Sequence, residues 1–300
     1  IYFIMLSDKL KNYLHLHILV FIAGFTAILG ELISIGSIPL VWFRMLIAAS
    51  ILVVYLKFKK TNLVVKPNAI LKFFLAGVII ALHWITFFES IEQSNISIAL
   101  AMFSTGAFFA SFIEPIFFKR KIIWYEILFG VMVVFGVWLI TQAEIKYIKG
   151  ILLGISSAFF SSLFAVINGQ FIKRYSASII SFYEFVSGVL FISLFIGFFG
   201  DGFNLDFFKL SHTDWLYLII LGSICTAYAF IAAVYIMKYI SPYTVVLTYN
   251  LEPIYGIALA IILFPVKEKM STEFYIGAII IFSVVILNAI LKHTRPLKHS

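Results

Sequence analysis

The feature that most constrains this chain is a series of long apolar runs, each about as long as a helix needs to be to cross a bilayer. Ten such runs alternate with short stretches of charged or turn-forming residues: 15–35, 38–56, 70–91, 96–118, 122–141, 150–171, 177–200, 215–237, 242–264 and 274–291. A helix of about 20 apolar residues spans the hydrocarbon core, and it satisfies its backbone hydrogen bonds internally. We therefore predict an all-α integral membrane protein with ten transmembrane helices.

The composition excludes an ordinary soluble domain. Hydrophobic residues make up 63% of the chain and charged residues only 12%, whereas a soluble domain has about 45–50% apolar and about 25% charged residues. The formal charge of +8 does not indicate nucleic-acid binding, because the basic residues lie between apolar runs. The single cysteine, Cys225, excludes an internal disulfide and is expected to be a small packing residue. Residues 1–14 contain no small-residue cleavage site, so we expect no removable signal peptide.

The positions of Lys and Arg predict how the chain is threaded, because short cytoplasmic loops retain these residues. If residues 1–14 are cytoplasmic, 16 of the 22 Lys and Arg residues lie in inside segments, 5 lie in outside loops, and Arg44 lies within a helix. The five outside residues are Lys146, Lys149, Lys209, Lys267 and Lys269. One miscounted helix would reverse every later loop, so the split favours ten crossings with both termini cytoplasmic. We expect a multi-pass protein of a bacterial cytoplasmic (inner) membrane.

Two stretches of the first half recur in the second half. "FIAGFTAILGELI" at 21–33 aligns with "FSSLFAVINGQFI" at 160–172 at an offset of 139. "YEILFGVMVVFGV" at 125–137 aligns with "TEFYIGAIIIFSV" at 272–284 at an offset of 147. These matches indicate that one five-helix unit is used twice.

The repeat predicts the organisation of the chain. The two five-helix units are expected at 15–141 and 150–291, between a cytoplasmic N-terminal segment at 1–14 and a basic cytoplasmic tail at 292–300. Because five is odd, the second unit enters the membrane from the opposite side. Such inverted repeats suit alternating access, in which a site near the midplane opens first to one side and then to the other.

Three short motifs, in this order and spacing, resemble the EamA-like branch of the drug/metabolite transporter superfamily. "WFR" at 42–44 lies in the second predicted helix, "LEP" at 251–253 lies in the ninth, and Glu273 and Gly277 open the tenth. The resemblance covers almost the whole chain. It implies a secondary carrier for small metabolites, often an exporter of amino acids or related compounds, with a central cavity between the repeats.

Arg44 lies in the middle of an apolar run, where an ionisable side chain costs at least about 2.5–3.5 kcal/mol and needs a partner or a watery cavity. It is roughly six residues, about 9 Å, from the outer end of its helix, and we expect Glu31 to lie level with it on the first helix. We predict an ion pair between the two; contact of Arg44 with an anionic substrate group is the alternative. In the second copy, Gln170 and Glu184 occupy these positions, and Glu184 is expected near the opposite membrane face from Arg44.

Two further ionisable residues are expected near the bilayer midplane. His83 can change charge near neutral pH, which suits a proton-coupled step, and a packing histidine is the alternative. Glu252 immediately precedes Pro253, which lacks a backbone donor and leaves carbonyl groups free to face a cavity. A carboxylate buried in a low dielectric retains its proton more readily, as a proton carrier must. Glu252 is thus our leading candidate for substrate or proton binding, with a structural pairing as the alternative.

Polar and aromatic residues at related depths complete the candidate site. Hydroxyl, amide and aromatic groups there are Ser104, Thr105, Asn250, Tyr249, Tyr228 and Trp84. Trp84 is expected to pack or to line the wall. Thr105 aligns with Glu252, whereas "IEP" at 113–115 does not align with "LEP", so no role is transferred to Glu114.

These features predict a secondary active transporter, namely a proton-coupled exporter of small metabolites such as amino acids. An uptake carrier for a nucleotide-derived metabolite, a membrane enzyme, and a channel or scaffold stay open as alternatives. No G-x-x-x-x-G-K-[ST] loop supports a primary pump, and no H-E-x-x-H or paired acidic run supports a metal-dependent enzyme. We expect no metal and no cofactor. The expected partners are a small-molecule substrate, the lipid bilayer and protons, and the chain is a monomer or a homodimer.

Overall fold

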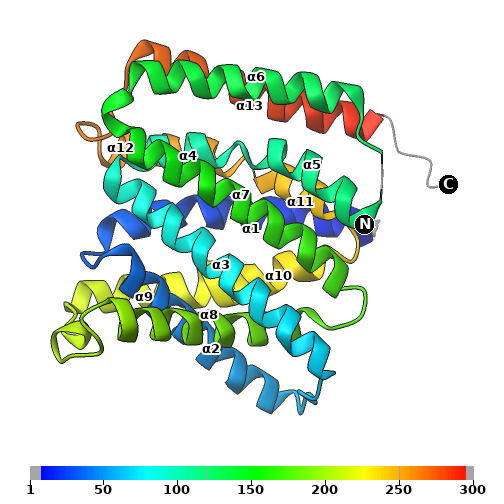
Figure 1. The fold of residues 1–300 in the computed structure, drawn as a ribbon, viewed down its shortest axis with the longest axis vertical. Coiled ribbons are helices and arrows are strands. Elements are labelled where there is room, and N and C mark those ends of the chain that lie inside the picture. Colours follow the sequence, from blue (N-terminus) through cyan, green and yellow to red (C-terminus); the bar gives the residue numbers. More distant parts are fainter. Residues whose placement is uncertain (1–7, 120, 250, 295–300) are drawn as a thin grey trace, which may run out of the picture.

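The structure is a computed structural model that describes residues 8–119, 121–249 and 251–294, and these residues contain helices and no β-strand (Figure 1). The α-helices are α1 (Asp8–Leu32), α2 (Ser37–Phe58), α3 (Pro67–Gln93), α4 (Ile96–Phe103), α5 (Gly106–Phe118), α6 (Trp124–Ala143), α7 (Ile148–Phe171), α8 (Ala177–Phe199), α9 (His212–Gly222), α10 (Ala229–Ile236), α11 (Pro242–Tyr249), α12 (Glu252–Leu263) and α13 (Thr272–Thr294). Two short 3₁₀ helices are η1 (Ile145–Tyr147) and η2 (Asp206–Phe208), and η3 (Ser223–Tyr228) is a π-helix.

The helices follow the order of the predicted apolar runs, but three of the runs are interrupted. The fourth is divided into α4 and α5, where the hydroxyls of Ser104 and Thr105 bond back to backbone carbonyls of the preceding turn. The eighth contains η3, in which Thr226 donates to the carbonyl of Leu221, five residues earlier. The ninth is divided into α11 and α12, and Pro253 lies in the first turn of α12, where a missing N–H costs nothing.

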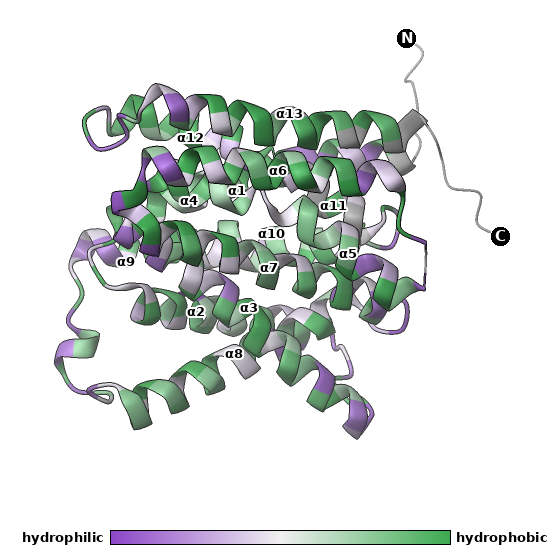
Figure 2. Cartoon of the chain, turned by 45° about the horizontal axis from the view of Figure 1, so that its top comes forward, coloured by the Kyte–Doolittle hydropathy of each residue, from purple (hydrophilic) through white to green (hydrophobic). Residues whose placement is uncertain are grey.

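The surface and the helix lengths identify a multi-pass membrane protein. Among the described residues, eight helical segments are long and apolar enough to cross a membrane, and two shorter apolar helices, Glu252–Leu263 and Thr272–Leu287, follow them. Large hydrophobic side chains such as Leu71, Val131 and Ile279 are more than 60% exposed. Hydrophobic residues run along the helices, and hydrophilic residues gather at their ends (Figure 2). Such a surface is compatible with lipid and not with water.

The two halves of the chain pack as antiparallel counterparts. α6 lies along α13, α4 packs against α12, and α5 packs against α11 (Figure 1). Because α4 precedes α5 whereas α12 follows α11, the matching runs of the two halves cross the bundle in opposite directions. The remaining contacts are also matched: α3 packs on α7 and α8, as the α9–η3–α10 run packs on α1 and α2. A two-fold relation between the halves accounts for both observations.

α6 and α13 form a pair at the edge of the bundle (Figure 1). Gly136 and Gly277 allow the two backbones to approach closely, since a Cβ atom on Gly277 would lie only 2.8 Å from the carbonyl oxygen of Gly136. Small residues commonly permit this kind of helix contact in membranes. The pair therefore supports the bundle from outside, and the cavity described below lies among the other helices.

Candidate functional site

A cavity of about 140 Å³ lies between the two halves of the chain. Both halves contribute to its wall: α1 to α5 from the first, and α7, η3 and α10 to α12 from the second. The lining residues are Ala23, Thr26, Arg44, Ile80, His83, Trp84, Phe87, Phe103, Gly106, Ser161, Ser162, Phe164, Ala165, Cys225, Ala229, Phe230, Ala233, Met237, Val245, Tyr249 and Glu252. None of these described lining residues comes from α6, α8, α9 or α13.

The cavity reaches toward the end of the bundle at which α1 begins and α13 ends, here called the N/C end. Met237 directly follows α10, and Val245 lies in the first turn of α11, both at the N/C end (Figure 1). On the other side, lining residues such as Arg44 and Phe87 lie about 9–11 Å of helix from the start of α2 and the end of α3. The cavity therefore extends closer to the N/C end than to the opposite end.

Carboxylates join the two halves at the opposite end. Asp214, in the first turn of α9, accepts hydrogen bonds of 2.8 Å from both the backbone N–H and the hydroxyl of Ser34. Glu268, between α12 and α13, accepts hydrogen bonds of 3.0 and 2.9 Å from the backbone N–H groups of Ile96 and Ser97. Those two residues begin α4, where a carboxylate both satisfies free N–H groups and complements the helix dipole. These contacts close the bundle beyond Arg44 and Phe87.

Arg44 forms a charged part of the cavity wall and is only 3% exposed. Its Nε donates a 2.6 Å hydrogen bond to Oγ1 of Thr226, in the π-helix. The guanidinium carbon lies 3.9 Å from the centroid of the Trp84 ring, a cation–π contact. No carboxylate of the described residues lies within ion-pair distance of Arg44, and Glu252 acts on it electrostatically from farther away.

The predicted ion pair between Glu31 and Arg44 is wrong. α1 continues to Leu32, so Glu31 lies in the last turn of its helix, whereas Arg44 lies two turns inside α2. Glu31 therefore lies at the opposite end of the bundle and forms an ion pair with Lys267 of the other half. The prediction failed because the first helix was expected to continue to residue 35, whereas α1 ends at Leu32, so Glu31 lies directly before the turn and not at the depth of Arg44.

His83 lines the cavity and also has a packing role. Its Nδ1 lies 2.8 Å from the hydroxyl of Ser157, and its ring stacks on Phe103 with centroids 5.4 Å apart. Ser157 in turn donates to the backbone carbonyl of His83. The hydrogen bond orients the imidazole ring toward α7, and a proton-carrying role for it stays a prediction.

Glu252 and Tyr249 line the cavity on either side of the interruption between α11 and α12. Glu252 is 6% exposed and is the first residue of α12, where the positive end of the helix dipole stabilises a negative charge. Asn250, the predicted polar neighbour, lies outside the described residues. The interruption thus places a carboxylate at the cavity between two half-helices, an arrangement found at substrate sites of carriers.

Several predicted site residues do not line the cavity. The hydroxyls of Ser104 and Thr105 are occupied by carbonyls of their own helix turn. Tyr228 is 48% exposed and its hydroxyl contacts His15, because the π-helix shifts the helical phase and turns this side chain outward. Glu184 is fully buried between α7 and α8, where it accepts a hydrogen bond from the side chain of Asn168.

Small polar residues inside apolar runs are the cavity residues that sequence reasoning missed. They include Thr26, Ser161, Ser162, Cys225 and, behind Arg44, Thr226. Ser162 bonds to the carbonyl of Gly106, so it also joins α7 to the start of α5. The cluster "SSAFFSS" at 156–162 was the available signal. The described residues contain no group of three or more His, Cys, Asp or Glu side chains that could hold a metal ion.

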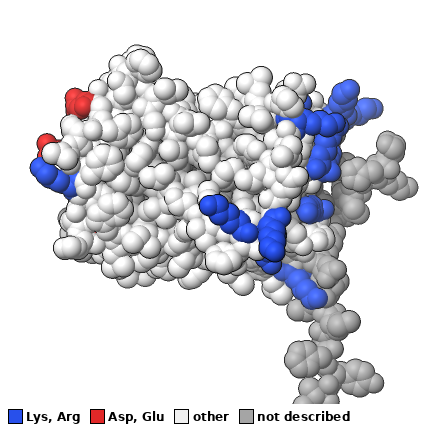
Figure 3. Space-filling view, turned by 90° about the horizontal axis from the view of Figure 1, so that it is seen from below, with Lys and Arg blue, Asp and Glu red and all other residues white. Residues whose placement is uncertain are grey.

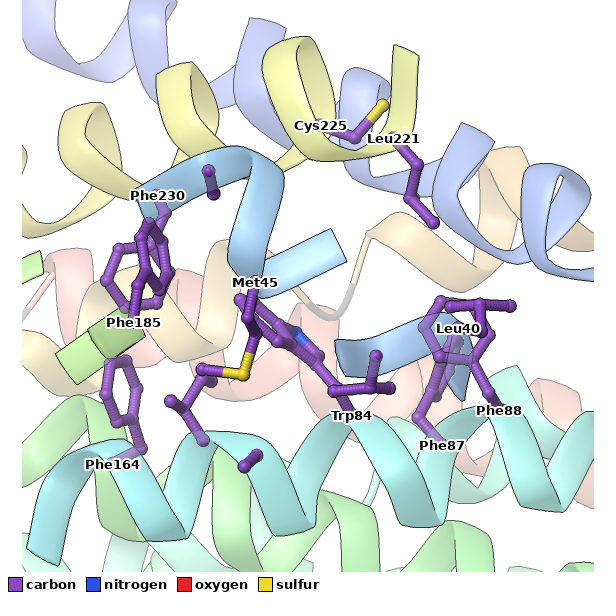
Figure 4. Close-up of a cluster of buried hydrophobic side chains, with 14 of the residues drawn as sticks. Leu40, Met45, Trp84, Phe87, Phe88, Phe164, Phe185, Leu221, Cys225 and Phe230 are labelled. Atoms are coloured by element: carbon purple, nitrogen blue, oxygen red, sulfur yellow. The ribbon is translucent and has the colours of Figure 1, made fainter. Parts of the chain in front are cut away.

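The rest of the wall is apolar and rich in aromatic rings. Figure 4 shows the lining residues Phe164 and Phe230 close to Phe185 of α8, which packs behind the wall with its ring centroid 4.7 Å from that of Phe230. Trp84 also packs on Phe230, with centroids 5.9 Å apart. A concave apolar site with a few polar groups is typical of a pocket for a small organic molecule.

Comparison with known proteins agrees with this arrangement. The sequence profile described as the EamA-like transporter family matches the chain twice, at residues 10–142 and 148–290. One protein crystal structure aligns with 97% of this chain and 100% of its own, with a TM-score of 0.69 and 13% sequence identity, which shows a shared fold alone. No curated protein sequence matches the chain.

Proposed function

The chain belongs to the EamA-like transporter family, and from that membership we propose that it is a secondary carrier that moves a small metabolite across a membrane by alternating access. In this proposal the chain crosses the membrane ten times, as two inverted five-helix units, and both termini lie in the cytoplasm of a bacterium. Most of the Lys and Arg side chains seen in Figure 3 gather toward the N/C end, with acidic side chains at the other end. This distribution supports a cytoplasmic N/C end.

The observation that carries the proposal is the position of the cavity between antiparallel counterparts. Both halves line it, it reaches toward the N/C end, and carboxylate hydrogen bonds between the halves close the opposite end. A carrier needs a site of this kind that one half can expose while the other half covers it. A channel would need a continuous path, and an enzyme would need clustered catalytic groups.

Proton coupling and the direction of transport are further parts of the proposal. Glu252 and His83 lie in the cavity wall and are the proposed proton carriers, and the proposed direction is export of a small metabolite. The buried position of Glu252 beside the interrupted helix supports this role. An uptake carrier would use the same site with the opposite gradient.

Reconstitution in proteoliposomes tests the proposal. Efflux from liposomes loaded with a radiolabelled metabolite panel should saturate, and an inward proton gradient should accelerate it. Glu252→Gln should abolish the response to the gradient, whereas Glu273→Gln, at an exposed carboxylate away from the cavity, should leave it unchanged. Flux that never saturates, or a chemically altered substrate, would contradict a carrier.

Orientation is tested in intact cells with a Cys225→Ser background. Lys209→Cys, in the loop before α9, should react with a membrane-impermeant maleimide, and Lys238→Cys, after α10, should react only after the membrane is opened. Both lysines are exposed. The reverse pattern would contradict the proposed threading without touching the assignment to the family.

A further inference from the structure

We propose that Arg44 is the receptor for the anionic group of the transported compound, so that the cavity takes a small carboxylate whose remaining body is apolar. The inference rests on the proposed carrier function and names its substrate class. It follows from the charge, the free donors and the surroundings of this one side chain.

The charge of Arg44 is permanent and has no described counter-ion in contact. A guanidinium stays protonated even when it is buried. Arg44 is 97% buried, with 3% of its surface exposed, and no described carboxylate lies within ion-pair distance. A buried charge of this kind is costly unless an opposite charge joins it. An anionic ligand in the adjoining cavity would supply that charge.

The donors of Arg44 are largely unused. A guanidinium has five N–H donors, and the described residues accept a single hydrogen bond from this one, at Oγ1 of Thr226. One terminal amino nitrogen, Nη1, is buried without any hydrogen-bond partner. The Nε bond and the Trp84 ring, 3.9 Å from the guanidinium carbon, hold the planar group in place. The ring lies against the face of the guanidinium, whereas a planar carboxylate binds such a group along its edge, through the nitrogens.

The surroundings of Arg44 decide what the rest of the ligand must be. The wall around it is mostly apolar, with the rings of Trp84, Phe87, Phe103, Phe164 and Phe230. A strongly polar group placed against these rings would lose its hydration without replacement. A cationic ligand would be repelled by Arg44. An apolar body with one carboxylate is the chemistry that satisfies both parts of the cavity.

The carboxylate of Glu252 competes with an anionic ligand for the positive charge of Arg44. It is the one carboxylate among the described lining residues, and it acts on Arg44 from beyond contact distance. When it is ionised it offsets part of the positive charge that a ligand would otherwise neutralise. Removing the charge of Glu252 should therefore strengthen the binding of an anion, which is the opposite of the usual effect of a mutation in a binding site.

Matched probes test the charge requirement. Thermal unfolding of the purified full-length protein is followed at one pH with phenylacetate, phenylacetamide and phenethylamine, and with benzoate, benzamide and benzylamine. The carboxylate of each series should stabilise the protein saturably, at concentrations about tenfold below those of its amide and amine, because a hydrogen bond to a charged group is worth about that factor or more. Equal or better stabilisation by the amides or amines, or none by either carboxylate, would overturn the inference.

Variants assign the effect to Arg44. Arg44→Gln should weaken carboxylate binding about tenfold or more, because the ligand then loses a charge-assisted contact. Lys267→Gln, which removes a cation at the opposite end, should leave binding unchanged. Glu252→Gln should tighten carboxylate binding severalfold, and it keeps the test decisive if Arg44→Gln does not fold. The comparison with Glu252→Gln is made at an alkaline pH, at which Glu252 of the unmodified protein is ionised, and unchanged or weaker carboxylate binding there would contradict the competition that the inference requires.

Binding and transport separate this inference from the proposed function. Saturable carboxylate binding without any carboxylate flux in liposomes would contradict the carrier function and leave the role of Arg44 standing. Saturable flux of an amine that Arg44→Gln does not alter would contradict the inference and leave the carrier function standing.

Discussion

The second helices of the two halves, α2 and α8, carry a basic and an acidic residue at matching positions. Arg44 lies seven residues after the start of α2, and Glu184 lies seven residues after the start of α8. Both are buried. Arg44 lines the cavity, whereas Glu184 is enclosed by protein, with one oxygen bonded to Asn168 and the other without a described partner. Equivalent places in the repeat therefore have unequal surroundings, as a bundle with its cavity at one end requires.

Two glycines at matching positions show the same asymmetry in the backbone packing. A Cβ atom on Gly77 of α3 would lie 2.4 Å from the carbonyl oxygen of Glu184. A Cβ atom on Gly222 of α9 would lie 3.3 Å from the carbonyl oxygen of Arg44, and its nearest contacts would be with the side chain of Ile47. Helix packing is thus tighter beside Glu184 than beside Arg44. The helices around Glu184 are therefore packed more closely than those around Arg44 in this structure.

The largest expected effect concerns these glycines. Gly77→Ala should lower the free energy of unfolding by about 3 kcal/mol, because the methyl group meets backbone that cannot move aside. Gly222→Ala should cost about 1–2 kcal/mol, because the Ile47 side chain can adjust in part. Unfolding in mixed micelles measures both. Equal losses would mean that the two contacts are equivalent after all.

The second-largest effect is a difference in ligand binding between variants of Arg44 and Glu184. Arg44→Gln and Glu184→Gln each remove a buried ionisable group that has no ion-pair partner among the described residues, so neither should lower the melting temperature much. Stabilisation by phenylacetate should fall in Arg44→Gln, by about 1.4 kcal/mol at saturating ligand for a tenfold change in affinity. Glu184→Gln should retain it. A ligand response that depends equally on both residues would break the distinction between α2 and α8.

A smaller effect is expected where the halves meet at the opposite end. Glu268→Gln should lose one of two hydrogen bonds to the start of α4, at about 1 kcal/mol. It should also let a maleimide reach Cys225, which lines the cavity, from that end. Glu144→Gln is the matched control, because Glu144 accepts a similar bond from Ser271 at the edge pair α6–α13. Faster labelling in the control as well would indicate general loosening instead of opening.

The smallest effect is expected at the surface ion pair. Lys267→Met breaks the contact with Glu31, but both side chains retain access to solvent, so the loss should be at most about 0.5–1 kcal/mol. Phenylacetate binding should not change. A large loss of stability would show that this pair, and not the hydrogen bonds of Asp214 and Glu268, holds the opposite end together.

Two expectations at the site failed because a helix end or a helical turn differs from the one that was expected. Glu31 and Arg44 were paired on the assumption that the first helix continues to residue 35, whereas α1 ends at Leu32 and the turn begins earlier. Tyr228 was expected at the cavity, but one π-helical turn changes which side of the helix it occupies. An apolar run does not specify where a helix ends to within a few residues, or which side of the helix a residue faces to within about 100°.

Other site residues could not be found because their partners are far away in the chain. Thr226 matters through Arg44, 182 residues earlier, and Ser157 matters through His83, 74 residues earlier. Nothing in the residues next to them indicates these contacts. Glu252 was within reach of prediction because its signal, a carboxylate directly before a proline in an apolar run, is local.

The sequence by itself determined the solvent in which this protein folds, the positions of its helical runs and the internal repeat, since hydropathy, run length and self-similarity are properties of neighbouring residues. The tertiary structure alone decided which of two matching helices faces a cavity, and which buried charge is left with free hydrogen-bond donors. The physical reason is that a repeated sequence encodes both halves almost alike, whereas packing the halves against each other closes one end of the bundle and leaves space near the other.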